Sequence, residues 1–346
     1  MEGMLMRRVM TIGLLLCGVL QAHAWGNRGH QLVAYIAYEN LDPGTRAKVD
    51  ALIQRNPCIG EWKTAVSGLP ASEQPVALFM LGANWPDRIK LTAPKSKTPY
   101  DCPGHPTFLT TDGGKGADGR FSADIPPPDM TAASQITGYS DARRHQYWHF
   151  IDTPISGDGT KTTPEYTPNV LSELKLLVAK LATTTDPDLR SYELVWIEHL
   201  MGDLHQPLHD AQRFTKTLHD GDQGGNKVLI GAPGAKYPSN LHAYWDDLPG
   251  SDSSLAATIK MGAGLNQGKA PSAATLDISH PEDWATATEA LAQNHAYAAP
   301  FNGDGSQVDP KDIPAAYHAQ AMKDMQSQIF LAGQRLAAML KTGLKN

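Results

Sequence analysis

The stretch Trp196–Asp210, W-I-E-H-L-M-G-D-L-H-Q-P-L-H-D, constrains the fold more than any other part of the chain. Apolar residues in and just before it recur at helical spacing: Leu194, Ile197, Met201, Leu204 and Leu208. His199 and Asp203 are four residues apart on a different face, where an imidazole and a carboxylate can reach the same ion. Pro207 is expected to bend or end the helix and to re-aim His209. The pattern predicts a helix that presents potential metal ligands on one face.

Similar amphipathic spacing predicts helices along much of the chain. The expected helices are Gly29–Asn40, Arg46–Arg55, Val170–Leu181, Ser191–Leu204, Ala285–Gln293 and Ala315–Leu340. The alternation of Val, Ile and Thr that is typical of strands is scarce. Residues Leu91–Tyr139 break the helical pattern with a long segment rich in Gly, Pro, Ser and Thr, a kind that is either functional or mobile in compact proteins. We therefore expect an all-α, mainly α-helical fold with long irregular loops, including an insertion at about 91–140.

The amino-terminal residues have the features of a secretory signal peptide. Two arginines precede the apolar run Val9–Leu20, and an Ala-x-Ala triplet that ends at Ala24 follows it. The run is shorter than the ~20 residues that span a bilayer. We expect residues 1–24 to be removed during export to the periplasm or the medium, with no membrane anchor. Residues 25–346 would then form a single domain that begins at Trp25.

Charge and cysteine content limit the possible sites. The formal net charge is −6, and no basic patch indicates nucleic-acid binding through the protein's own charges, although bound metal ions can supply local positive charge. Cys17 belongs to the predicted signal peptide, so the mature chain keeps Cys58 and Cys102, an even pair in an exported protein. We expect one disulfide between them. Two cysteines are too few for a thiolate-rich zinc site, so a metal here would depend on histidine, carboxylate and the amino terminus.

Three further segments place histidine or aspartate beside tryptophan. N-W-P-D-R-I-K contains Asp87 and Lys90, Y-W-H-F-I-D contains His149, Phe150 and Asp152, and N-L-H-A-Y-W-D contains His242 and Asp246. His242 and Asp246 repeat the four-residue spacing of His199 and Asp203. Clusters of these donors in an exported chain with little cysteine fit zinc. The sequence has neither a Gly-x-Ser-x-Gly elbow nor the His-Glu-x-x-His motif of zinc proteases.

With these residues the sequence resembles the S1/P1 nuclease family, zinc-dependent nucleases related in fold to bacterial phospholipase C. In that family the mature chain begins Trp-Gly-x-x-Gly-His, and its Trp offers zinc a free α-amino nitrogen and a carbonyl oxygen; W-G-N-R-G-H at Trp25–His30 matches this start. The resemblance continues through Gly224–Lys227 to Ala332–Leu336 and implies three Zn²⁺ ions. One zinc would be held by Asp87, His149, His199 and Asp203, a second by Trp25, His30 and the other oxygen of Asp203, and a third by His209, His242 and Asp246.

The resemblance also implies a chemistry. A hydroxide that bridges two close metals would attack phosphorus, and the third zinc would stabilise the leaving oxygen. Asp87 would orient the attacking water, and Lys90 would help to neutralise the transition state. Phe150 would stack on a base whose edge Asp152 reads, which favours single strands. The expected activity is hydrolysis of single-stranded DNA and RNA to 5′-phosphorylated products, with 3′-nucleotidase activity, by a monomer without a stable protein partner.

Two other functions would use the same donors. A zinc-dependent phospholipase C is disfavoured because the phospholipase relatives carry Glu at the position of Asp246, and because a lipid does not need the base site of Phe150 and Asp152. A catalytically silent zinc-binding protein is disfavoured by intact Lys90 and Asp87. The interval between Asp87 and His149 is longer than the family usually shows. Its insertion could cover or extend a substrate cleft, or lie far from the metals.

Several nearby residues have ordinary alternatives. His205 lies inside the Trp196–Asp210 motif, but the family does not use it as a ligand, and we expect it to pack or to support a ligand. Phe150 could belong to the core, and Lys90 could be a solvated surface charge. We expect the remaining histidines of interest to face solvent: His105, His145 and His219.

Overall fold

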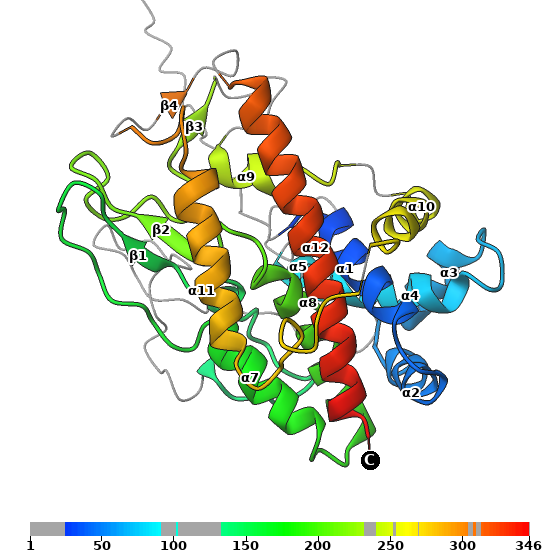
Figure 1. Cartoon of the computed structure of the whole chain (residues 1–346). Coiled ribbons are helices and arrows are strands. Elements are labelled where there is room, and N and C mark those ends of the chain that lie inside the picture. The colour runs from blue at the N-terminus through cyan, green and yellow to red at the C-terminus, as the bar shows by residue number, and fades with distance from the viewer. Residues whose placement is uncertain are drawn as a thin grey trace, which may run out of the picture.

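The computed structural model describes residues 25–90, 102, 133–231, 240–251, 254–268, 270–303, 307–308 and 313–345. The predicted signal peptide, most of the predicted 91–140 insertion and His105 lie outside these residues. The described chain is mostly helical, with two short two-stranded sheets (Figure 1). The expectation of an all-α fold with loops is therefore confirmed.

Every helix expected from the sequence is present, and further short helices join them. The helices are α1 Asn27–Glu39, α2 Pro43–Ile53, α3 Ile59–Val66, α4 Gln74–Ala83, α5 Trp85–Lys90, η1 Gln146–His149, α7 Val170–Leu181, α8 Pro187–Asp203, α9 Leu241–Asp246, α10 Leu255–Leu265, α11 Pro281–Leu291, η2 Ala292–Ala296 and α12 Ala315–Gly343. The helices α3, α4, α5, η1, α9 and α10 were not expected. The apolar α4 is buried on nearly all sides and lacks the one-sided pattern that reveals longer helices.

Helix α8 begins one turn earlier than its apolar pattern indicates. Asp186 caps the helix by accepting a hydrogen bond from the amide of Asp188 at 2.8 Å, and Pro187 occupies the first helical position. Proline is favoured there because its missing N–H would have had no partner within the helix. The first turn is largely exposed, so the apolar pattern starts only at Ser191. α8 ends at Asp203, before Pro207.

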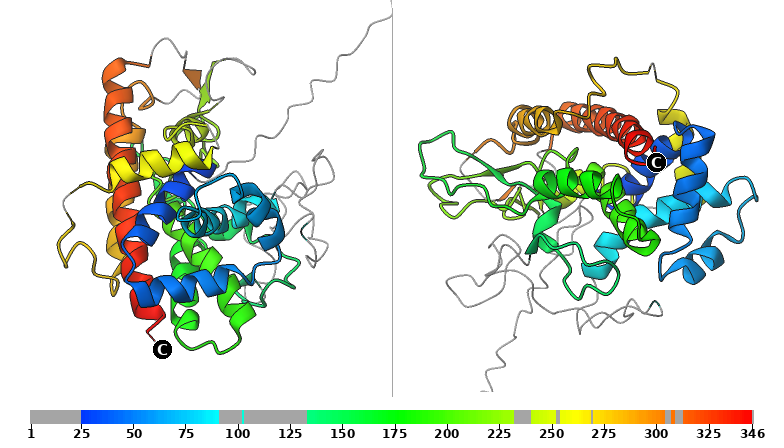
Figure 2. Two further views of the ribbon diagram at one scale, coloured as in Figure 1. Left: turned by 90° about the vertical axis from the view of Figure 1, so that its right-hand side faces the viewer. Right: turned by 90° about the horizontal axis from the view of Figure 1, so that it is seen from below.

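Helix α8 is enclosed by the rest of the molecule. Every residue from Ser191 to Asp203 is buried, so its polar face points into the interior, as its apolar stripe does. α1 packs against α4, α8 and α12, while α12 runs past α1 and α8 with α11 beside it (Figures 1 and 2). Gly333 permits the close approach of α12 to α1, because a Cβ at this position would lie 2.6 Å from the Cβ of Ile36.

The two sheets are small and parallel. β1 (Thr153–Ile155) pairs with β2 (Ala211–Arg213), and β3 (Leu229–Ile230) pairs with β4 (Gln307–Val308). The first pair matters for the site because it joins the segment after His149 to the segment after His209. Among the described residues, no helix combines the length and the apolar character needed to cross a bilayer.

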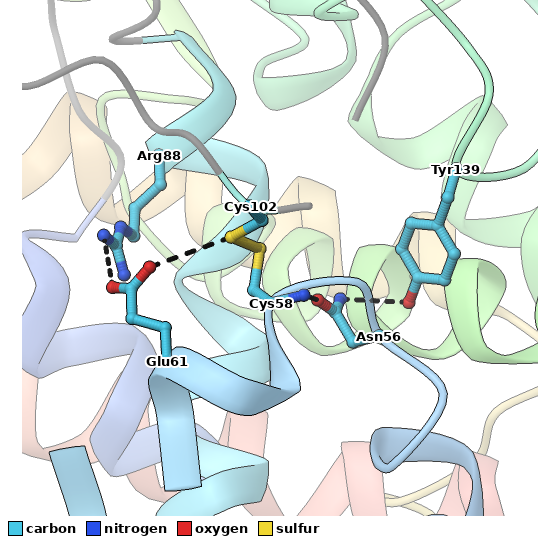
Figure 3. The surroundings of a disulfide bond; sticks show 6 residues. All are labelled: Asn56, Cys58, Glu61, Arg88, Cys102 and Tyr139. Atoms are coloured by element: carbon cyan, nitrogen blue, oxygen red, sulfur yellow. Dashed lines mark hydrogen bonds and ion pairs between the residues drawn. A yellow bond between two sulfur atoms is a disulfide. The ribbon is translucent and has the colours of Figure 1, made fainter. Parts of the chain in front are cut away.

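The predicted disulfide is present. It joins Cys58, just before α3, to Cys102, with the two Cα atoms 4.9 Å apart. Figure 3 shows Glu61 of α3 beside this bond, in an ion pair with Arg88 of α5 at 2.9 Å. The disulfide and this ion pair together support the short helix that carries Asp87.

Candidate metal centre

The predicted histidine and aspartate ligands converge in the interior from several parts of the chain. They are His30 on α1, Asp87 on α5, His149 on η1, His199 and Asp203 on α8, His209 in the following turn, and His242 and Asp246 on α9. None exposes more than 5% of its surface. Three sets have ligand atoms within 4.8 Å of one another: His30, Asp87 and His199; His149, His199 and Asp203; and His209, His242 and Asp246. The first two sets share His199, and we call them together the central group; the third is the outer group.

Asp203 lies at the middle of the central group. Its Oδ2 is 3.0 Å from His149 Nδ1 and 3.2 Å from His199 Nε2, while its Oδ1 is 3.5 Å from His30 Nε2. The two oxygens therefore face different partners, which fits the expectation that each serves a different ion. Asp87 Oδ1 approaches the same histidines, at 3.4 Å from His199 Nε2 and 3.8 Å from His149 Nδ1.

His30 enters the central group through a close contact between α1 and α8. Its ring stacks on that of His199 with centroids 3.8 Å apart, and its Nε2 lies 4.0 Å from Asp87 Oδ2. A Cβ on Gly202 would lie 2.6 Å from His30 Nδ1, so only glycine leaves room for this ring. Sequence reasoning gave Gly202 no role. The sequence does contain a signal for this role, namely a glycine in the interior of a helix. Glycine lowers helix stability there, so its presence indicates a position where another residue approaches closely.

The outer group is assembled from a turn and a six-residue helix. His242 Nε2 lies 3.1 Å from His209 Nε2 and 3.5 Å from Asp246 Oδ2. Gln206 donates from its Nε2 to Asp246 Oδ1 at 2.7 Å and so orients this carboxylate. Asn240 starts α9 by accepting a hydrogen bond from the amide of Ala243 at 2.8 Å.

Backbone carbonyls orient three of the imidazoles. His199 Nδ1 lies 2.7 Å from the oxygen of Ala83, and His242 Nδ1 lies 2.7 Å from that of Gly224. His209 Nδ1 lies 2.5 Å from the oxygen of His149. A carbonyl can only accept, so each Nδ1 carries the proton and each Nε2 is directed at its group. Histidines that bind metal are held in this way.

The donor set fits metal ions. His30 Nδ1 and Nε2, His149 Nε2 and Asp203 Oδ1 are buried, and none makes a hydrogen bond to another described residue. Such orphaned polar atoms are costly unless a ligand satisfies them. Buried imidazole nitrogens and carboxylate oxygens, without thiolates, are donors that zinc accepts.

The electrostatics of the protein alone are unfavourable at this site. Burial lowers the pKa values of His30, His149 and His209 well below the ordinary value. Burial also acts on His199, but Asp203 and Asp87 outweigh it and raise the pKa to about 9. Burial raises the pKa of Asp203 to about 6 and that of Asp246 well above its ordinary range. Bound cations favour neutral imidazoles and ionised carboxylates, so they would reverse the raised pKa values of His199, Asp203 and Asp246 and reinforce the lowered values of the other three histidines.

Comparison with known proteins identifies the family. Residues 120–345 match the family model described as S1/P1 Nuclease. The chain belongs to the S1/P1 nuclease family. Endonuclease 3 of Arabidopsis thaliana is 40% identical over 55 residues, 16% of either chain. Nuclease S1 of Aspergillus oryzae is 26% identical over 160 residues, which are 42% of this chain and 52% of that protein. The chain thus aligns with about half or less of the length of these relatives.

Three predicted ligands precede the region that matches the family model. His30 and Asp87 are brought into the central group by the packing of α1 and α5. Trp25 is fully buried, and the amide of Gly26, next in the chain, donates to the backbone oxygen of Asp246 at 3.0 Å. Trp25 therefore lies next to the outer group's helix. Its ligand role stays a prediction, because its α-amino group becomes free only when residues 1–24 are removed.

Lys90 is a buried cation beside the central group. Its Nζ lies 2.6 Å from Asp87 Oδ1, and only 6% of the residue is exposed. Arg144, also buried, donates to the backbone oxygen of Lys90 at 3.3 Å. The alternative of a solvated surface charge is therefore wrong. The predicted role in neutralising phosphoryl charge is consistent with this position.

Phe150 and Asp152 lie against the outer group. The amides of Ile151 and Asp152 both donate to the backbone oxygen of His209, at 2.8 and 3.2 Å. The Phe150 side chain is only partly buried and packs against the core, whereas Asp152 is 8% exposed and has a φ of 58°, in the left-handed region. Phe150 directly follows the predicted ligand His149 in the chain, and its partly exposed ring is available for stacking.

Three other histidines that the sequence analysis named lie in different environments. His205 is buried outside the three metal sets; burial and the neighbouring Arg335 lower its pKa to about 3, so the ring is neutral. His219 is exposed, as expected. The expectation that His145 faces solvent is wrong. It is fully buried, stacked on Trp148 at 3.7 Å and bonded to Asp141 at 2.8 Å, because an aromatic cluster encloses it.

Proposed function

We propose that this protein is an exported zinc-dependent phosphodiesterase that hydrolyses single-stranded DNA and RNA to 5′-phosphorylated products, with 3′-nucleotidase activity. One observation carries the proposal: eight buried histidines and aspartates converge as potential metal ligands in a chain of the S1/P1 nuclease family. With Trp25 they would hold three Zn²⁺ ions, in the sets that the sequence predicts. Both relatives carry names of nucleases, which supports a nucleic-acid substrate.

The chain's own residues would supply binding and charge around the metals. Bound zinc would act as a Lewis acid on the phosphoryl group and make water acidic enough to react near neutral pH. Asp87 would orient the attacking water. Lys90, whose Nζ lies 2.6 Å from Asp87 Oδ1, would stabilise negative charge that develops on the phosphoryl oxygens. Phe150 would stack on a base, with Asp152 beside it to read the base edge.

The decisive experiment is product analysis of a single-stranded oligonucleotide incubated with zinc-loaded protein that begins at Trp25. Zinc-dependent release of 5′-phosphorylated fragments, absent after chelation, is the expected result. A matched protein with an additional methionine before Trp25 should lose most of the activity and bind less zinc, because an internal tryptophan has no free amine. Full activity of this extended protein would refute the amino-terminal ligand.

The alternatives appear as other outcomes of the same experiment. Phosphatidylcholine vesicles serve as a second substrate. Lipid hydrolysis without oligonucleotide cleavage would identify a phospholipase C. A protein that binds zinc fully but cleaves neither substrate would be a silent zinc binder, and the proposed activity would be wrong.

A further inference from the structure

The turn Leu204–Leu208 connects the two groups of potential ligands. Asp203 precedes it in the central group, and His209 follows it in the outer group. Within the turn, Gln206 holds Asp246 of the outer group at 2.7 Å and also accepts a hydrogen bond from the amide of Leu208 at 2.6 Å. The conformation of these few residues therefore decides how the two groups are placed relative to each other.

His205 occupies this turn with both ring nitrogens engaged. Its Nε2 lies 2.7 Å from Arg335 Nη1, and its Nδ1 lies 2.8 Å from the backbone oxygen of Met201. A guanidinium can only donate, so Nε2 accepts and Nδ1 carries the proton that is donated to Met201. This explains why a histidine two residues from Asp203 lies outside the metal sets.

Arg335 is itself held in place from α11 and the segment before it. Its Nε donates to the backbone oxygen of Thr275 at 3.1 Å, and its guanidinium lies over the Trp284 ring at 4.6 Å. The stacked, bonded guanidinium has little freedom to move. Arg335 belongs to the Ala332–Leu336 motif, for which the proposed chemistry has no use.

Helix α12 holds the turn at a second point. Gln328, two helical turns before Arg335, donates to the backbone oxygen of His205 at 3.3 Å and to Thr288 of α11 at 3.0 Å. Figure 1 shows α12 and α11 side by side, with α8 behind α12. The ring and the backbone of His205 are thus both anchored to a helix pair that carries none of the predicted ligands.

We propose that Arg335 and His205 form a positioning pair, which fixes the turn Leu204–Leu208 and thereby keeps Asp203 of the central group in register with His209 and Asp246 of the outer group. The inference rests on the proposed metal centre. Neither residue belongs to the ligand sets, so the pair acts through the turn. Loss of the pair should weaken metal binding. The outer group should be affected most, because Gln206 lies in the turn and His209 follows it directly.

The test measures zinc stoichiometry and affinity by competition with a chelator, at a temperature where each variant keeps the wild-type circular dichroism. Arg335→Met should weaken the most loosely bound zinc about 10- to 100-fold, as is typical for outer partners of metal ligands. His205→Leu should have the same effect. His205→Gln offers an oxygen to accept from Arg335 and should retain most of the affinity. In oligonucleotide cleavage, kcat should fall for the first two variants with little change in KM.

Arg46→Met is the matched control. Arg46 lies over the Tyr38 ring at 4.7 Å and donates to the backbone oxygen of Tyr38 at 3.0 Å, at the far end of α1 from His30. Zinc affinity should be unchanged in this variant. If Arg335→Met bound all its zinc with wild-type affinity and lost only thermal stability, or if His205→Gln were as damaged as His205→Leu, the positioning role would be wrong.

The zinc measurement separates this inference from the proposed function. Wild-type protein that binds three zinc ions but cleaves no nucleic acid would overturn the proposed activity, while the affinities of the variants would still decide the role of Arg335 and His205. Wild-type protein that binds no zinc would overturn both.

Discussion

The central and outer groups use the same kinds of side chain but are built differently. The central group comes mainly from two long helices, α1 and α8, that pack directly against each other and against α12. The outer group comes from a turn and the six-residue α9, and depends on hydrogen bonds from Gln206 and to the Gly224 carbonyl. Sites on packed helices are held more rigidly than sites on loops. We therefore expect the central group to bind metal more tightly than the outer group.

The charges of the two groups differ as well. The central group has two carboxylates, Asp87 and Asp203, with the buried Lys90 beside one of them. The outer group has one carboxylate, Asp246, beside two imidazoles. Because the two central carboxylates would serve two ions and Lys90 offsets one of them, the central group has no greater negative charge per ion, and the expected difference in affinity rests on the rigidity of its packed helices. The comparison predicts a stepwise loss of metal, with the outer ion leaving first.

The largest effect is expected from Asp203→Ala, because both of its oxygens face histidines of the central group. Hydrolysis should fall by at least about a thousandfold. Loss of a residue that only hydrogen-bonds to a metal ligand typically costs about 10- to 100-fold. Zinc content and oligonucleotide cleavage would be measured beside Asp188→Ala, a surface carboxylate paired with Arg55. Unchanged hydrolysis in Asp203→Ala would refute the assignment of the centre.

A smaller and more selective effect is expected from His242→Ala. It should remove the outer zinc and lower hydrolysis by about a hundredfold. The central metals should stay bound, because His242 does not belong to the central group. Metal analysis by native mass spectrometry would count the remaining ions. Loss of all three ions together would show that the two groups do not bind metal separately.

Phe150→Ala probes the surface beside the outer group. If the ring stacks on a base, cleavage of an oligonucleotide should lose about 1–3 kcal/mol of transition-state binding, while a small phosphodiester without a base should be cleaved nearly as before. The ratio of kcat/KM for the two substrates is the measurement. Equal losses on both would mean that Phe150 is a packing residue.

Gly202→Ala tests the close contact that brings His30 into the central group. The new Cβ would meet His30 Nδ1 at 2.6 Å, so the ring must move or α1 must shift. We expect stability to fall by about 1–3 kcal/mol and central zinc to bind more weakly. Gly60→Ala in α3 is the control, since nothing lies within 4 Å of its added Cβ. Chemical denaturation and zinc titration of both variants would check this, and matching behaviour of the two would contradict it.

The smallest effect on hydrolysis is expected at Glu193, which lies on α8 but outside both groups. Burial raises its pKa from 4.5 to about 7, and Thr184 donates to it at 2.7 Å. The folded protein keeps a proton that the unfolded chain releases, so the free energy of unfolding falls as pH rises from about 4.5 to about 7. Glu193→Gln should remove this slope and be more stable than wild type by about 1–3 kcal/mol above the window. Parallel pH dependences of the two proteins would contradict the raised pKa.

Sequence reasoning succeeded where the information is local. Helical periodicity predicted the long helices, and the cysteine count predicted the Cys58–Cys102 disulfide. It missed the first turn of α8, because capping by Asp186 and Pro187 leaves no apolar pattern there. It also missed α4, whose apolar residues surround the helix and show no face.

What the sequence by itself determined is the set of donors: spacing places His199 with Asp203 and His242 with Asp246, because residues four apart on a helix are neighbours. Only the tertiary structure decided which distant residues join them, since the placement of His30 depends on the gap that Gly202 leaves between α1 and α8. It also decided that His145 is enclosed by aromatic rings and that His205 points at Arg335 rather than at the metal sets. Such choices depend on what packs against a side chain, and packing partners far apart in sequence leave no periodic signal.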